Sequence, residues 1–213
     1  LLYGAFVLHA VTILGVAHTA PFSPWSFGDY LSRMMPLLWI GMLFFLTFYT
    51  SPQARRAAIL MDATPMPPKQ YALARCAAAL TGGALLTLLC MVEAAVFYGR
   101  MFHWYSWGSL LLPALVTLLP ALVFALGSGW LAGQIRPWLV YVWMAVPFLL
   151  AALPLPEALG LWNGSFFTAY PLTLETLDPA FVVPVGVTVV QVVLLAAGTV
   201  LLILGSNRRK VMR

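Results

Sequence analysis

The chain has 213 residues, of which 62% are hydrophobic and only 8% are charged, and its formal net charge is +5. An average soluble domain has about 25% charged residues, so a soluble fold of this length could not bury so much apolar surface. We therefore expect an all-α membrane protein that forms a single membrane domain over residues 1–213. Transmembrane barrel strands would need about ten residues of strict alternation, which does not occur in this sequence.

Six apolar stretches approach the roughly 20 residues that a helix needs to cross the hydrocarbon core. They cover residues 1–17, 35–48, 73–98, 109–131, 138–153 and 181–204. The second stretch is short unless it begins nearer Tyr30. Since the first stretch begins at Leu1 rather than at Met, we expect the numbering to start after a further N-terminal segment. The sequence thus predicts six transmembrane helices.

Lysine and arginine are divided unequally between the two sides of these predicted helices. Nine of the 11 fall in the loops after the second and fourth stretches and in the tail: Arg55, Arg56, Lys69, Arg75, Arg136, Arg208, Arg209, Lys210 and Arg213. The other side holds Arg33 and Arg100. The positive-inside rule places the larger group, and both termini with it, in the cytoplasm. Anionic lipid headgroups are a sufficient partner for the net positive charge, and no nucleic acid is expected.

The predicted outer loops are rich in aromatic residues, notably at residues 24–27 and 103–107. Such rings commonly lie at the headgroup level of a bilayer, and we expect them there. The longest outer loop, about residues 154–180, mixes apolar and acidic residues. It predicts short helices that lie at the outer leaflet or dip into it.

A polar insert between the second and third stretches, about residues 51–72, is the most informative segment. Ser51 and Pro52 would end one helix and begin another, because proline is tolerated in the first turn of a helix. Pro65 would break the new helix, since the residue before a proline avoids the α region, and Pro68 could open the next one. The insert is therefore expected to form a helix, a stiff elbow and a second helix. An ordinary basic loop that only sets topology is the alternative interpretation.

From Ile59 to Arg75 the insert reads ILMDATPMPPKQYALAR, and this segment resembles the type-2 ABC transporter permease family. Members commonly have leucines, a small residue or threonine, a proline, a short variable stretch, a basic residue, an aromatic residue, and a lysine or arginine where the third helix starts. The six-helix layout and the long outer loop before the last helix are similar too. Residues 55–58 read RRAA where the family usually has an acidic-rich approach, which leaves the subfamily and the cargo open.

The resemblance implies a type-2 ABC exporter-like bundle in a prokaryotic cell membrane. The chain would be the permease subunit of an ATP-driven exporter of an amphipathic drug, a lipid-linked molecule or a peptide. Its coupling residues to a separate ATPase subunit would be Arg55, Arg56, Leu60, Asp62, Thr64, Pro65, Lys69 and Tyr71. That partner would bind ATP and Mg, because this chain has no phosphate-binding loop and is not expected to be an enzyme. A second permease, identical or different, would complete the transporter.

Several residues in the predicted helices are further candidates. Glu93 is the one acid in a predicted transmembrane helix, which makes it a candidate for the cargo path. It also lies about 37 Å along a helix that starts near Pro68, so interfacial anchoring near the outer surface, or an ion pair with Arg100 there, is the preferred interpretation. Small residues that would permit close helix contact, within the chain or in a dimer, are Gly82, Gly83, Gly129 and Gly133. Residues that could line a passage, although threonine often bonds to its own helix, are Thr81, Thr87, Thr117 and Gln191.

Other functional classes remain open. An ATP-independent secondary carrier or channel would have paired charges at mid-depth and would follow an ion gradient. An intramembrane enzyme could use Ser128, but a serine nucleophile needs a base, and no histidine follows His103. A non-transporting anchor for another complex is a third alternative. The three histidines are scattered along the chain, so no haem or metal site is expected.

Overall fold

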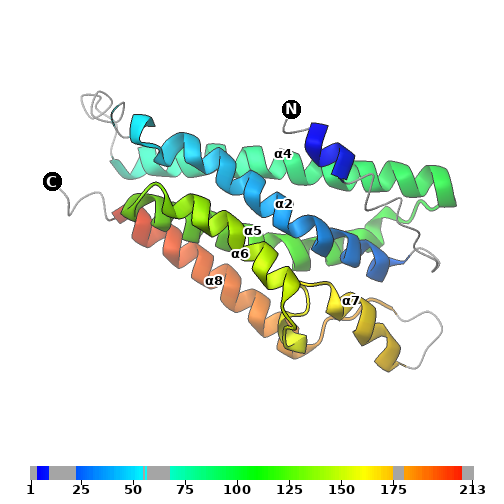
Figure 1. Ribbon diagram of the computed structural model, residues 1–213. Coiled ribbons are helices and arrows are strands. Elements are labelled where there is room, and N and C mark those ends of the chain that lie inside the picture. The colour runs from blue at the N-terminus through cyan, green and yellow to red at the C-terminus, as the bar shows by residue number, and fades with distance from the viewer. Residues whose placement is uncertain (1–3, 10–22, 55, 57–67, 175–179, 208–213) are drawn as a thin grey trace.

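The computed structural model describes residues 4–9, 23–54, 56, 68–174 and 180–207. Over this part of the chain all regular structure is helical, and five helices form an elongated bundle (Figure 1). They are α2 (Pro24–Thr50), α4 (Pro68–Phe102), α5 (Leu111–Ile135), α6 (Leu139–Ala152) and α8 (Val185–Asn207). A short helix, η1 (Trp107–Leu110), leads into α5, and η2 (Glu157–Leu159), α7 (Ser165–Ala169) and η3 (Tyr170–Leu174) lie between α6 and α8.

Four of these helices are long and apolar enough to cross a membrane, namely α2, α4, α5 and α8. The expected all-α class with several transmembrane helices is thus supported, but with four such helices in the described chain rather than six. α6 has 14 residues, so it is about 21 Å long and shorter than the roughly 30 Å hydrocarbon core. Of the first predicted span, only residues 4–9 are described, as a helix.

The start of α2 corrects the prediction for residues 24–27. The helix begins at Pro24, far before the predicted start at residue 35, with the Ser23 hydroxyl accepting the Ser26 N–H at 3.4 Å. Trp25 is buried in the first turn of this helix, with its ring centroid 4.8 Å from that of Phe181, and does not lie in a loop. The prediction of a loop at these residues was wrong, because the segment between α6 and α8 supplies an apolar cover that the local sequence does not reveal.

The helix ends separate into two groups along the bundle (Figure 1). The C-terminal ends of α2, α5 and α8 lie with the start of α4 at one end, and α7 lies at the other. The described edges of the polar insert therefore share an end of the bundle with Arg136, which directly follows α5. The predicted cytoplasmic side requires that the insert and Arg136 lie at the same end of the bundle.

α2 and α5 form the interior of the bundle, while α4 and α8 face outward. The most apolar windows of α2 and α5 are each 61% buried, against 22% for α4 and 17% for α8. Trp39 in the middle of α2 is fully buried and contacts the rings of Phe124 on α5, Trp143 on α6 and Trp162 between α6 and α8. A movement of α2 would therefore displace the side chains that contact it on most of the other helices.

Candidate functional site

Both edges of the polar insert are described, and both match the expected helix breaks. The Ser51 N–H donates to the Thr47 carbonyl at 3.0 Å and closes α2, while the Ser51 hydroxyl accepts the Ala54 N–H at 3.2 Å. The second bond is an N-cap for the turn that begins at Pro52, because it satisfies one of the free amides of a new helix. At the other edge α4 begins at Pro68, as expected.

The predicted coupling residues fall partly inside and partly outside the described chain. Arg56 is helical and exposed, and Lys69 lies in the first turn of α4. The residues outside the described part are Arg55, Leu60, Asp62, Thr64 and Pro65.

Tyr71, another predicted coupling residue, is held by Arg75 one turn further along α4. The Arg75 guanidinium lies 3.9 Å from the centroid of the Tyr71 ring and also donates a hydrogen bond to the Tyr71 hydroxyl. Arg75 is buried, with 7% of its surface exposed. A cation over an aromatic face is favourable, more so when both groups are removed from water. The pair therefore stiffens the first turns of α4, directly after the insert.

The four glycines predicted at helix contacts all face α2. A Cβ added to Gly82 would lie 2.8 Å from the Phe45 ring, and one added to Gly83 would lie 2.5 Å from the Met42 methyl. For Gly129 and Gly133 on α5 the corresponding distances are 2.2 Å to Leu43 and 2.5 Å to Thr50. In the structure these contacts lie within one chain, where glycine lets α4 and α5 approach α2.

A tighter glycine contact was missed by the sequence analysis. α5 and α8 share the most extensive helix contact, and a Cβ added to Gly127 would lie 2.0 Å from the carbonyl oxygen of Gly198. Gly205 lies seven residues after Gly198 on α8, against Trp130. This seven-residue spacing on one helix face is a signal that could have identified the contact, because small residues mark close helix packing in membranes.

Glu93 does not form the predicted ion pair with Arg100. Both carboxylate oxygens of Glu93 are buried and have no hydrogen-bond partner, whereas Arg100 is exposed. The two residues are seven positions apart, about 10 Å along the helix, and their side chains end in different surroundings. In the described chain the ion pair is instead Asp29–Arg33 on α2, at 2.9 Å. A carboxyl that faces the interior without a partner keeps Glu93 a functional candidate.

The residues predicted to line a passage differ in their hydrogen bonding. The hydroxyls of Thr81 and Thr87 donate to the carbonyls of Ala77 and Gly83 on the same helix, each at 2.9 Å. Thr117 on α5 and Gln191 on α8 are buried, on the two helices that share the largest contact. The Thr117 hydroxyl and the Gln191 side-chain nitrogen have no hydrogen-bond partner among the described residues, so these two positions stay candidates for a path.

Ser128 is occupied by hydrogen bonds. Its hydroxyl donates to the Phe124 carbonyl and accepts the indole N–H of Trp143 at 2.7 Å. The Trp39 indole N–H in turn donates to the Trp143 carbonyl at 3.2 Å. The serine proposed for an intramembrane enzyme therefore joins α5 to α6.

No group of three or more histidine, cysteine, aspartate or glutamate residues in the described ranges is arranged to hold a metal ion. The comparisons with known proteins add no identity: no family model, no curated protein and no solved structure matches the chain.

Proposed function

We propose that this chain is the permease subunit of an ATP-driven transporter, and that it exports an amphipathic cargo across a prokaryotic cell membrane. The observation that carries the proposal is the polar insert between α2 and α4, whose two edges are a capped helical turn after Ser51 and a helix start at Pro68. A segment of this kind at the cationic end of the bundle is suited to contact a soluble ATPase. ATP and Mg belong to that partner, and a second permease completes the path.

The position of α2 supports a mechanical role for the insert. α2 contacts α4, α5, α6 and α7, and its C-terminal end leads directly into the insert. On the other side the insert continues into α4, whose start is stiffened by Tyr71 and Arg75. When the two ATPases close on ATP, a push on the insert would tilt these helices as rigid bodies and reshape the path between two permeases.

An ATP-independent carrier is the second candidate. Such a carrier needs charged or protonatable groups that bind the coupling ion, and Glu93 is the described residue that favours it. The described ion pair, Asp29–Arg33, joins two residues of the same helix near the end opposite the insert. It therefore does not link two helices that could move relative to each other during transport. We favour the ATP-driven transporter over this carrier, because the insert offers a contact surface for an ATPase.

The experiment that tests the proposal is gentle purification from the native membrane followed by mass spectrometry. The wild type is compared with a variant in which Arg55, Arg56 and Lys69 are changed to Ala. Arg136→Ala is the matched control, because Arg136 is exposed at the same end of the bundle but lies outside the insert.

We expect a near-stoichiometric nucleotide-binding ATPase with the wild type and with Arg136→Ala, and its loss from the triple variant. An ATPase retained by the triple variant would keep the transporter class but move the contact elsewhere. An intact preparation without any ATPase would contradict the proposal and favour the gradient-driven carrier.

A further inference from the structure

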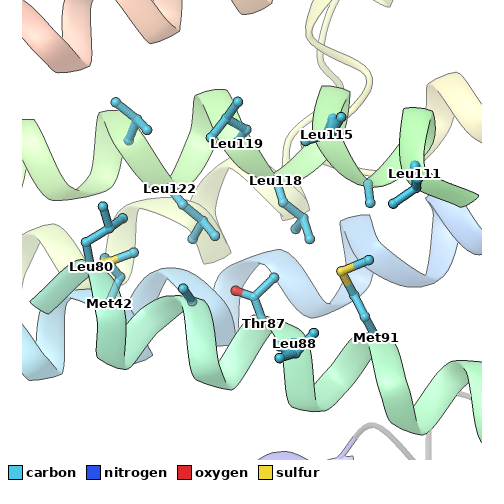
Figure 2. A pocket seen from close by; sticks show the side chains of 13 residues that line it. Met42, Leu80, Thr87, Leu88, Met91, Leu111, Leu115, Leu118, Leu119 and Leu122 are labelled. Atoms are coloured by element: carbon cyan, nitrogen blue, oxygen red, sulfur yellow. The ribbon is translucent and has the colours of Figure 1, made fainter. Parts of the chain in front are cut away.

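A groove of about 300 Å³ lies between α4 and α5, where the two helices make few direct contacts. Leu80, Thr87 and Met91 on α4 face Leu111 and Leu118 on α5, and Met42 of α2 lies behind them (Figure 2). The rim is continuous with the outward surface of both helices, since Leu88 is 56% exposed and Leu115 is 56% exposed. The groove therefore opens sideways onto the surface that faces the bilayer.

The lining of the groove is hydrocarbon and thioether. Its one polar side-chain group is the Thr87 hydroxyl, which already donates to the Gly83 carbonyl at 2.9 Å. A polar ligand would lose hydrogen bonds to water or headgroups here and gain none in return, which is unfavourable in an apolar environment. The part of any occupant that lies in the groove must therefore be hydrocarbon.

The dimensions of the groove suit a single hydrocarbon chain. From Leu80 to Met91 it is about 16 Å long, which is close to half of the roughly 30 Å hydrocarbon core. The groove holds about 300 Å³, in which one flexible chain can lie along the two helices.

The depth of the groove selects one leaflet. On α5 the lining residues run from Leu111, the first residue of the helix, to Val123 at its centre. This half of α5 lies at the end of the bundle opposite the insert. Just above it, the Tyr105 and Trp107 rings lie against Gly99 of α4, at a level that suits headgroups.

We propose that the groove between α4 and α5 binds one acyl chain of an outer-leaflet phospholipid, which fills the gap between the two helices. The bound chain replaces the direct packing that α4 lacks on this side. The proposal concerns the chain alone and does not depend on the presence of an ATPase partner.

The test uses the full chain in nanodiscs that contain phosphatidylglycerol with a diazirine near the middle of one acyl chain. After illumination, peptides from α4 and α5 are expected to carry about tenfold more label than peptides from the exposed face of α8. Ala84→Phe places a ring in the groove and should lower this label about tenfold. Ala196→Phe, at an exposed alanine on α8, is the matched control and should leave the label unchanged.

Leu115→Phe fills the groove from the opposite wall and serves if Ala84→Phe does not give a folded, monodisperse protein. Equal labelling of α8 and the groove, or labelling that neither filling variant reduces, would overturn the proposal. A disulfide formed between two chains that each carry Leu119→Cys, in place of lipid labelling, would show that a second copy fills the groove and would also overturn it.

Discussion

At the residue scale, glycine determines how closely the helices of this bundle approach. Gly198 is the strongest case, because a Cβ added there would lie 2.8 Å from the backbone of Phe124. A side-chain neighbour could change rotamer, but a helix backbone can only move as a whole. The α5–α8 contact is therefore expected to be sensitive to a single methyl group.

We expect Gly198→Ala to destabilise the protein by about 1–3 kcal/mol through overpacking, seen as a lower apparent melting temperature in detergent. Gly186→Ala is the control on the same helix, since a Cβ at Gly186 meets nothing within 4 Å. That control should be neutral or slightly stabilising, because alanine favours a helix over glycine by about 1 kcal/mol. Equal melting temperatures for the two variants would contradict the described α5–α8 contact.

At the element scale, α6 is joined to its neighbours by two side-chain hydrogen bonds. It is too short to span the hydrocarbon core by itself, and Trp143 joins it both to Ser128 of α5 and to Trp39 of α2. In a bilayer no water replaces a lost partner, so these bonds fix the position of α6.

We expect Ser128→Ala to cost about 1–3 kcal/mol, because it leaves the Trp143 N–H without an acceptor. Trp143→Phe combined with Ser128→Ala should cost less than the sum of the two single changes, because the single changes remove the same bond. Thermal unfolding of the single and double variants measures this coupling. Ser206→Ala is the control, since the Ser206 hydroxyl bonds only to its own helix, at Leu202.

Ser128→Ala also distinguishes an intramembrane enzyme from a permease. An intramembrane enzyme with Ser128 as its nucleophile would lose all activity on Ser128→Ala, whereas a permease would keep transport in proportion to the folded fraction. If the stability losses of Ser128→Ala and Trp143→Phe are strictly additive in the double variant, the hydrogen bond between Ser128 and Trp143 contributes nothing to stability.

At the scale of the whole molecule, the orientation in the membrane follows from where the cations gather. Arg136 lies at the insert end of the bundle, and residues 103–106 lie between α4 and η1 at the other end. The two native cysteines, Cys76 and Cys90, are free and buried, so neither is expected to react quickly with an aqueous thiol reagent.

This provides a direct measurement of orientation. We expect a membrane-impermeant maleimide to label Ser106→Cys in intact cells, and to label Arg136→Cys only after the membrane is opened, because cationic loops stay in the cytoplasm. Both positions are exposed. The wild type, with its two buried cysteines, supplies the background. Labelling of Arg136→Cys in intact cells would reverse the predicted sides.

Much of the element-level structure could be predicted from local rules. The length of the apolar runs predicted α4, α5 and α8, and proline stereochemistry predicted the breaks at Ser51 and Pro68. The start of α2 escaped prediction, because Asp29 and Arg33 interrupt the apolar run that would have identified the helix. In the structure these two charges pair with each other, one turn apart at 2.9 Å, so the helix continues through them.

The sequence by itself determined the all-α class, the strong apolar bias and the polar insert, because these depend on composition and on residues a few positions apart. Only the tertiary structure decided that Trp25 is buried, that the carboxyl of Glu93 turns inward, and that α5 and α8 meet at Gly127 and Gly198. Each of these depends on a surface supplied by residues distant in the chain, and no local pattern specifies which distant surface a side chain will meet.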